Sequence, residues 1–217
     1  GLHLSRAVQV WNLKPFWEIR DGKIINHWVI AALYPQSSPA FIGRIATVLV
    51  VMIGVAAGFA LARREFGVLP AGFVIWMWSF TPYLFFYERL AFSDAEAGAL
   101  ALAAIWAALR LTRTGKIRDA LLTGVILGSA VLFKFTAVPA GLSVALIMLL
   151  LARYPIRRRI TLLIVVGAVV AALFAVPVGY LLLRHSSLFD IALGWISGGD
   201  GGGAARIGVV ANAERFV

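Results

Sequence analysis

The chain of 217 residues is too apolar to be a water-soluble domain. Hydrophobic residues make up 61% of it and charged residues only 14%, so a soluble fold would lack the polar groups to cover its surface. A transmembrane helix needs about 20 apolar residues, and a chain of this length has room for about six of them. Composition therefore predicts an all-α, polytopic transmembrane helical bundle that forms one membrane domain.

The residue types exclude several kinds of chemistry. The chain contains no cysteine, which excludes disulfides, thiolate metal sites and a cysteine nucleophile. His3, His27 and His185 stand far apart and show no metal-ligand spacing. The net charge of +10 would suit nucleic acid, but in a membrane chain positive charge first reports topology. We therefore expect no histidine metal site and no nucleic-acid partner.

Hydrophobic runs separated by breaker residues predict the transmembrane helices in chain order. Each run is apolar over about 16 to 24 residues, which suits a helix that crosses a hydrocarbon core of roughly 30 Å. The six predicted spans are 41–62, 70–87, 94–111, 118–133, 137–152 and 160–183.

The charged residues between these runs predict the topology. The connections after the second and fourth spans carry one cation each, Arg89 and Lys134. The connections after the first, third and fifth spans carry Arg63, Arg64, Arg110, Arg113, Lys116, Arg118, Arg153, Arg157, Arg158 and Arg159. Because cytoplasmic loops hold the excess of Lys and Arg, the connections with these ten cations are expected in the cytoplasm and the other two outside.

This topology divides the chain into three parts. Residues 1–40 are expected to form an outer-face loop, residues 41–184 the transmembrane bundle, and residues 185–217 a Gly-rich, truncated outer-face loop. Residues 11–20 mix aromatic and charged side chains and are too polar to span, so we expect an interfacial helix that lies flat among the headgroups. Residues 27–34 are apolar but too short to cross, so they are interfacial or re-entrant.

A polar cluster lies between the second and third spans, on the predicted outer face. Charges are costly near lipid, so the acids and the arginine at this boundary need an explanation. Ser93 and Glu96 fit a capping box, with Ser93 as the N-cap. Glu88 and Arg89 fit an interfacial pair. Asp94 has two interpretations that remain open, helix-end electrostatics and a functional carboxylate that faces an outer cavity.

Two lysines are candidates for contact with an anionic group. Lys134 stands between two hydrophobic runs of about 16 residues, each about 24 Å long, so their junction is predicted below the outer surface. There Lys134 either snorkels towards water or meets a lipid phosphate, and the sequence leaves both roles open. Lys23 stands at headgroup level near Trp28, where a solvated interfacial turn is the favoured interpretation and phosphate contact the alternative.

Three short stretches carry a likeness to a known family. They are residues 21–34 running into the span with Gly43 and Arg44, residues 87–96 with a core of Arg-Leu-Ala-Phe-Ser-Asp, and residues 132–136 with Phe-Lys-Phe-Thr. In order and spacing they resemble the GT-C glycosyltransferases that use polyprenyl-phosphate sugars, which include protein mannosyltransferases and lipid A aminoarabinose transferases. The resemblance implies an outward-facing cavity that takes a lipid-phosphate sugar.

The resemblance also implies roles for individual residues. In such enzymes an acid of the first outer loop acts as base towards the acceptor. A further acid, after the third span as counted in the family, lies near that site, and Asp94 stands at its position here. With Asp94 as the catalytic candidate, we expect Lys134, Lys23, Arg89 and Glu88 to contact the substrate, the cations stabilising the leaving phosphate.

One element of the family pattern is missing from the printed chain. The Asp-Glu pair of the first outer loop is absent from residues 1–20, where Glu18 is the one acid and stands too close to the next span. We therefore expect the base upstream of Gly1. The approach to Trp28 also departs from the pattern of the family, since it reads Lys-Ile-Ile-Asn-His from Lys23 onward.

The predicted function is inverting transfer of a sugar from a polyprenyl-phosphate donor to a glycan, lipid or protein acceptor on the outer face of the cell membrane. The sequence assigns no cofactor and leaves room for a divalent cation. The alternative is a transporter or flippase, in which Asp94, Glu96 and Lys134 contact ions or substrate along a pathway. Transporters usually place charges at the bilayer midplane, whereas here they cluster at the outer boundary, which favours an outward-facing enzyme.

Overall fold

The structure, a computed structural model, describes residues 7–8, 10–11, 23–33, 38–81 and 93–183. Within these ranges the chain is helical apart from short connections and contains no strand, which confirms the all-α membrane bundle predicted from composition. The elements are α2 (Ile24–Ala32), α3 (Pro39–Phe66), α4 (Val68–Phe80), α6 (Ser93–Thr114), α7 (Ile117–Phe133), the 3₁₀ turn η1 (Phe135–Ala137), α8 (Val138–Leu151) and α9 (Ile156–Leu183).

The six predicted hydrophobic runs correspond to α3, α4, α6, α7, α8 and α9. Among the described residues, three helices are long and apolar enough to cross a membrane, namely Ala40–Phe66, Ser93–Thr114 and Ile156–Gly179. The helix α4 and the segment Phe135–Leu151 are apolar but shorter, and α7 has 17 residues, a length of about 26 Å. The predicted end of the second span, at residue 87, lies outside the described residues.

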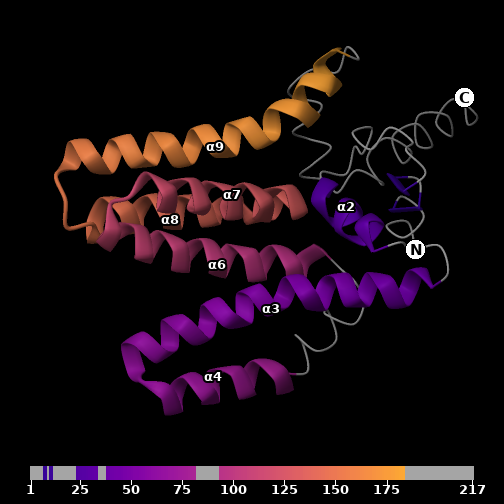
Figure 1. Cartoon of the computed structure of the whole chain (residues 1–217), viewed down its shortest axis with the longest axis horizontal. Coiled ribbons are helices and arrows are strands. Elements are labelled where there is room, and N and C mark those ends of the chain that lie inside the picture. The colour runs from indigo at the N-terminus through magenta and orange to yellow at the C-terminus, as the bar shows by residue number, and fades with distance from the viewer. Residues whose placement is uncertain (1–6, 9, 12–22, 34–37, 82–92, 184–217) are drawn as a thin grey trace, which may run out of the picture.

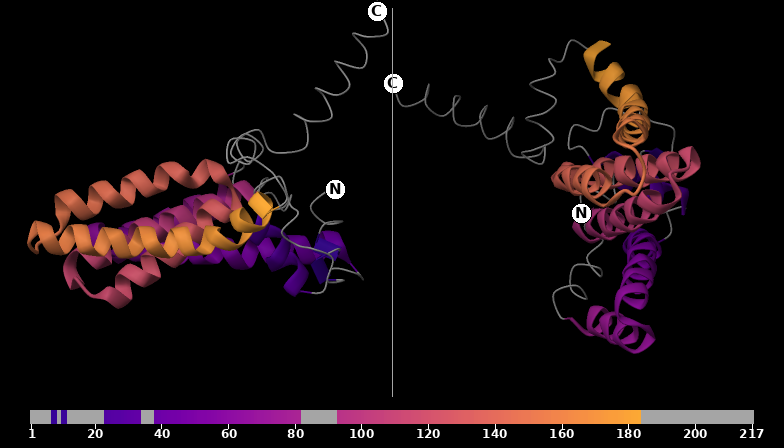
Figure 2. Two further views of the ribbon diagram at one scale, coloured as in Figure 1. Left: turned by 90° about the horizontal axis from the view of Figure 1, so that it is seen from above. Right: turned by 90° about the vertical axis from the view of Figure 1, so that its left-hand side faces the viewer.

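The long helices lie side by side along the long axis of the molecule (Figures 1 and 2). Helix α6 lies between α3 on one side and α7 and α8 on the other, while α4 packs on α3 and α9 packs on α7. Helix α2 has nine residues, about 13 Å, so it is too short to span, and it packs against α7 and α3 at one end of the bundle. This end positions the candidate site.

Small residues let the helix backbones approach closely. A Cβ atom added to Gly54 of α3 would lie 2.6 Å from the Cα atom of Ala99 in α6. A Cβ added to Gly124 of α7 would lie 2.7 Å from the Cβ of Val169 in α9. Because lipid tails are as apolar as the helices themselves, packing of this kind is a main source of helix association in a membrane.

Two tight turns at the same end of the bundle use glycine in the left-handed region. Gly67, with φ of 91°, joins α3 to α4, and its N–H donates to the carbonyl of Arg63 at 3.0 Å. Gly115, with φ of 59°, ends α6, and its N–H donates to the carbonyl of Leu111 at 2.9 Å. A side chain with a Cβ atom is strained at such φ values, so these short connections require glycine.

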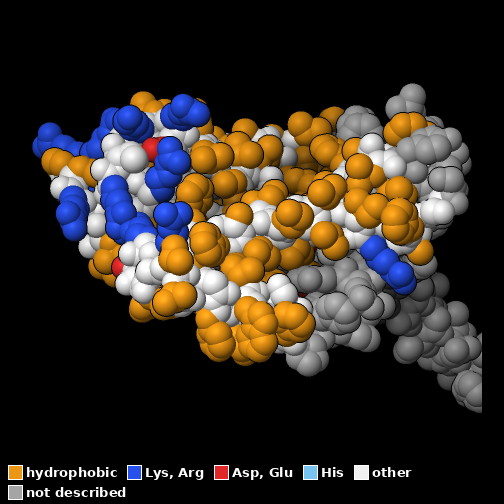
Figure 3. Space-filling view, turned by 60° about the horizontal axis from the view of Figure 1, so that its bottom comes forward, with side chains coloured by type: hydrophobic (Ala, Val, Ile, Leu, Met, Phe, Trp, Pro, Cys, Tyr) orange, Lys and Arg blue, Asp and Glu red, His pale blue; other side chains and the backbone are white. Residues whose placement is uncertain are grey.

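Lys and Arg side chains gather at the end of the molecule that carries these two turns (Figure 3), and the connections with the ten predicted cytoplasmic cations belong to this end. Antiparallel helices place every second connection at the same end, and the turns after α3, α6 and α8 all lie there (Figure 1). We call this the cationic end. The opposite end carries α2, the first turn of α6 and the junction between α7 and η1.

The close approach of α3 and α6 predicts a sharp difference between two glycine substitutions. Gly54→Ala should lower the free energy of unfolding by about 1–3 kcal/mol, because the added methyl group forces the helices apart. Gly167→Ala, at a helical glycine with nothing within 4 Å of an added Cβ, is the control and should be neutral or slightly stabilising. Thermal unfolding of the purified protein in detergent measures both, and equal midpoints would contradict the contact.

Candidate functional site

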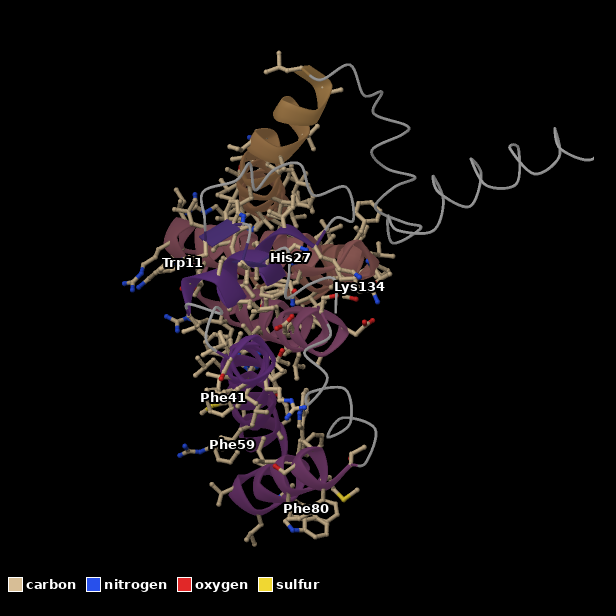
Figure 4. The ribbon with its side chains drawn as sticks, turned by 90° about the vertical axis from the view of Figure 1, so that its right-hand side faces the viewer. Trp11, His27, Phe41, Phe59, Phe80 and Lys134 are labelled. Atoms are coloured by element: carbon tan, nitrogen blue, oxygen red, sulfur yellow. The ribbon has the colours of Figure 1, made fainter. Side chains whose placement is uncertain are left out.

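The candidate site lies at the end of the bundle opposite the cationic end. Figure 4 views the molecule from this side, with His27 of α2 and Lys134 labelled. Three segments that are distant in the sequence meet here, because α2 packs on α7 and α3, and α6 begins beside η1. Two groups of polar side chains result, one exposed and one buried.

The exposed group is an ion pair between Lys134 and Asp94. Lys134 has an extended backbone, with φ of −159° and ψ of 128°, and stands alone between the end of α7 and the start of η1. Its Nζ donates to Oδ1 of Asp94 in the first turn of α6. The side chain of Lys134 is 27% exposed and that of Asp94 is 49% exposed. The structure therefore brings together two of the residues predicted from the sequence, 40 positions apart.

This pair is better suited to binding than to stability. An ion pair between partly exposed side chains contributes little to folding, typically ~0–1 kcal/mol. The ammonium group has three N–H donors and the carboxylate has two oxygens, so each partner keeps capacity for a ligand. A phosphate that approaches Lys134 would gain a charge-assisted hydrogen bond.

The buried group centres on Glu96, which is 0% exposed. The Nδ2 of Asn26 in α2 donates to one carboxylate oxygen of Glu96 at 2.5 Å, and the Oγ1 of Thr47 in α3 donates to the other at 2.9 Å. Asn26 and Thr47 are also fully buried. One carboxylate thus ties α2, α3 and α6 together, and we call these three residues the Glu96 cluster.

The capping-box interpretation of Glu96 is wrong. Both of its carboxylate oxygens accept hydrogen bonds from side chains of other helices, 70 and 49 positions away. Asp94 and Glu96 are two positions apart, about 200° around a helix of 3.6 residues per turn, so they point in different directions. Asp94 therefore faces Lys134 at the surface, while Glu96 faces the buried side chains of Asn26 in α2 and Thr47 in α3.

Asn26 and His27 are site residues that the sequence analysis assigned no role. Both are 0% exposed, on the face of α2 that packs against the bundle together with Ile24, Ile30 and Ala31. The Oδ1 of Asn26 has no hydrogen-bond partner within the described part of the chain. The available signal was a pair of polar residues inside the apolar run, but only the packing of α2 shows that they point inward.

Lys23 is a further site residue predicted from the sequence. Lys23 is half-buried and precedes α2, and its carbonyl accepts a hydrogen bond from the N–H of His27 at 3.4 Å. Ile24, the next residue, lies in one apolar cluster with Leu132 and Phe135, which are within two positions of Lys134. Lys23 therefore stands close to the segment that carries Lys134.

Glu88 and Arg89 lie outside the described residues, as do residues 12–20 of the predicted interfacial segment 11–20 and the predicted Gly-rich loop 185–217. Within the ranges that the structure describes, no group of three or more acids and histidines is arranged to hold a metal ion.

The fold and the site define a class of protein, a polytopic helical membrane protein with an acid and lysine pair opposite its cationic end. The particular family follows from comparison with family models. The model described as dolichyl-phosphate-mannose-protein mannosyltransferase matches residues 24–180, from the first residue of α2 into α9. The chain belongs to this family and is a membrane glycosyltransferase of the GT-C type, which confirms the resemblance found in the sequence. No curated protein and no solved structure matches the chain.

The Glu96 cluster predicts that loss of the buried hydroxyl of Thr47 lowers stability more than loss of an exposed hydroxyl. Thr47→Val should lower the free energy of unfolding by about 1–3 kcal/mol, because it leaves an oxygen of Glu96 buried without its donor. Thr161→Val removes an exposed hydroxyl that donates only to the carbonyl of Arg157, and it should change stability little. Thermal unfolding in detergent compares the two variants, and similar midpoints would show that the hydrogen bond from Thr47 to Glu96 does not contribute to stability.

Proposed function

We propose that this glycosyltransferase moves a sugar from a polyprenyl-phosphate donor to an acceptor hydroxyl at the membrane face that carries Asp94 and Lys134. The observation that carries the proposal is the partly exposed ion pair of these two residues, inside the region that matches the mannosyltransferase family. The family description names dolichyl-phosphate mannose as the donor and a protein as the acceptor. For this chain the donor class is proposed as a lipid-phosphate sugar, and the acceptor as a glycan, lipid or protein.

The proposed reaction is a single displacement at the anomeric carbon of the sugar. The acceptor oxygen attacks this carbon from the side opposite the phosphate, and the bond between carbon and phosphate oxygen breaks. The electron pair leaves with the polyprenyl phosphate, and the configuration of the sugar inverts. A carboxylate takes the proton of the acceptor hydroxyl. From the family resemblance we assign this base to an acid of the first outer loop.

Lys134 has the electrostatic role in this reaction. The leaving phosphate gains negative charge as the bond breaks, and an ammonium group held beside it stabilises that charge more in the transition state than in the ground state. Asp94 holds the ammonium in position through the ion pair, and its exposed side is free to orient the acceptor. Lys23 is the second cation proposed for the phosphate, because Ile24 packs beside the segment of Lys134.

Glu88 and Arg89 complete the proposed substrate contacts. They stand six and five positions before Asp94 in the sequence. Arg89 is proposed to bind the phosphate and Glu88 to contact the sugar or the acceptor.

The proposal also assigns the site to the outer face of the cell membrane. Lys and Arg side chains gather at the cationic end (Figure 3), whereas Asp94 and Lys134 belong to the first turn of α6 and the junction of α7 and η1 at the other end. An excess of cations marks the cytoplasmic side of a membrane protein. The donor would then enter from the outer leaflet, with its phosphate at the level of the ion pair.

The proposed reaction predicts that substitutions of Lys134 and Asp94 lower the rate of transfer, whereas substitutions of a lysine and an acid at the cationic end do not. In the complete protein in proteoliposomes, Lys134→Ala should lower the release of polyprenyl phosphate from a polyprenyl-phosphate mannose donor by about 10²–10³-fold. Lys134→Arg should retain part of the rate, since it keeps the charge. Lys116→Ala, at an exposed lysine of the cationic end, is the control and should retain the wild-type rate.

The acid is tested in the same assay. Asp94→Asn should lower the rate by a similar or smaller factor, and Glu65→Gln, at an exposed acid paired with Arg64, should not change it. The proposed site is rejected if both Lys134→Ala and Asp94→Asn release polyprenyl phosphate as fast as the wild type.

The proposed orientation predicts which end a reagent outside the cell reaches. The 217-residue chain has no cysteine, so single cysteines are informative once any others in the complete protein are replaced. A membrane-impermeant maleimide added to intact cells should label Ser38→Cys, at the exposed N-cap residue of α3, and should label Lys116→Cys only after lysis. The reverse pattern would place the site in the cytoplasm.

A further inference from the structure

A cavity of about 410 Å³ lies between α3, α6 and α7, away from the candidate site. Its walls include Met52, Ala56 and Ala60 of α3, Ala103 and Trp106 of α6, and Ile126 of α7. We call it the α3–α6 groove. The volume is within the range of roughly 300–1,000 Å³ that is usual for ligand sites.

The groove lies along the apolar middle of α3 and α6, between the candidate site and the cationic end. Ala103 and Trp106 follow Asp94 by nine and twelve residues, about 14 and 18 Å along α6. The two helices touch at Gly54 and Ala99, and the alanines beyond this contact leave the space open. Only hydrocarbon suits such a lining, because water in it would find too few hydrogen-bond partners.

Both walls of the groove continue into arginines. Trp106 and Arg110 are four residues apart on one face of α6, and the guanidinium carbon of Arg110 lies 5.9 Å from the centre of the Trp106 ring. On α3, Ala56, Ala60 and Arg63 follow one another at four and three residues, so they also share a face. Each wall of the apolar groove is therefore followed, about one helical turn further towards the cationic end, by an arginine.

The two arginines differ in how they are held. The Nε of Arg110 lies 3.2 Å from Oδ1 of the buried Asp119, which fixes the guanidinium beside Trp106 while half of its side chain stays exposed. Arg63 is exposed, and its guanidinium has no ion pair within the described residues. Together they offer donors to an anion at the headgroup level of the leaflet on the cationic side.

We propose that the α3–α6 groove binds an anionic phospholipid of the leaflet at the cationic end. One acyl chain fills the groove, and the phosphate lies between Arg63 and Arg110. Charge complementarity selects this occupant, because an apolar slot between helices that ends in two arginines matches a hydrocarbon tail with an anionic head. The site is separate from the proposed donor site, which lies at the opposite end of the bundle.

Native mass spectrometry of the complete protein in detergent tests the proposal, with phosphatidylglycerol as the probe and phosphatidylcholine of the same acyl chains for comparison. Phosphatidylglycerol should bind in a saturable one-to-one complex, at least five-fold more tightly than phosphatidylcholine. Arg63→Gln should weaken its binding by about five-fold, the loss of roughly 1 kcal/mol per cation. Arg157→Gln, at an exposed arginine of the cationic end on α9, is the control and should bind like the wild type.

A second variant tests the groove rather than the charge. Ala60→Leu should fill the space and lower phosphatidylglycerol binding by about ten-fold, whereas Ala168→Leu, at an exposed alanine of α9, should leave it unchanged. The proposal is overturned if Arg63→Gln binds like the wild type or if both lipids bind equally well. It is also overturned if no one-to-one complex forms, as when another helix covers the groove, or if Ala60→Leu changes the ratio of dimer to monomer and not lipid binding.

Discussion

Helices in lipid must be held together without a hydrophobic driving force between them, and this constraint organises the molecule. Two kinds of contact between helices provide the association. Glycine and alanine let α3 approach α6, and glycine lets α7 approach α9, until backbone and side chain are in direct contact. At one end, where α2 covers the bundle, the carboxylate of Glu96 receives hydrogen bonds from Asn26 and Thr47 and ties three helices together. A carboxylate buried at such a place is costly without partners, so the cluster is specified as a unit.

Because successive helices run in opposite directions, the arginine-rich connections and the candidate site lie at opposite ends of the bundle. Each tight turn reverses the chain, so the connections rich in arginine gather at the cationic end and the connection that carries Lys134 lies at the other. In the proposed topology the cationic end lies on the cytoplasmic side, and the opposite end carries the ion pair of Asp94 and Lys134. The family assignment gives this pair a context, since residues 24–180 contain both Asp94 and Lys134.

Helix α6 contributes residues to both ends of the bundle and to the α3–α6 groove between them. Its first turn presents Asp94 outward and Glu96 inward, its middle packs on α3 through alanines, and its last turns place Arg110 beside Trp106. The proposed transfer reaction uses only the first turn, and the proposed lipid site uses only the second half. A change in one region is therefore separable from a change in the other, because about 14 Å or more of helix lies between them.

The sequence by itself determined the fold class, the extent of most helices and the grouping of cations, because hydrophobic run length and loop charge are local properties of the chain. Its resemblance to the GT-C enzymes led to the correct family, and Asp94 and Lys134 were singled out individually. Only the tertiary structure decided that these two residues meet, and that Glu96 points inward to α2 and α3 instead of capping its own helix. Such contacts join positions 40 to 70 residues apart, and no local spacing records which helices pack together.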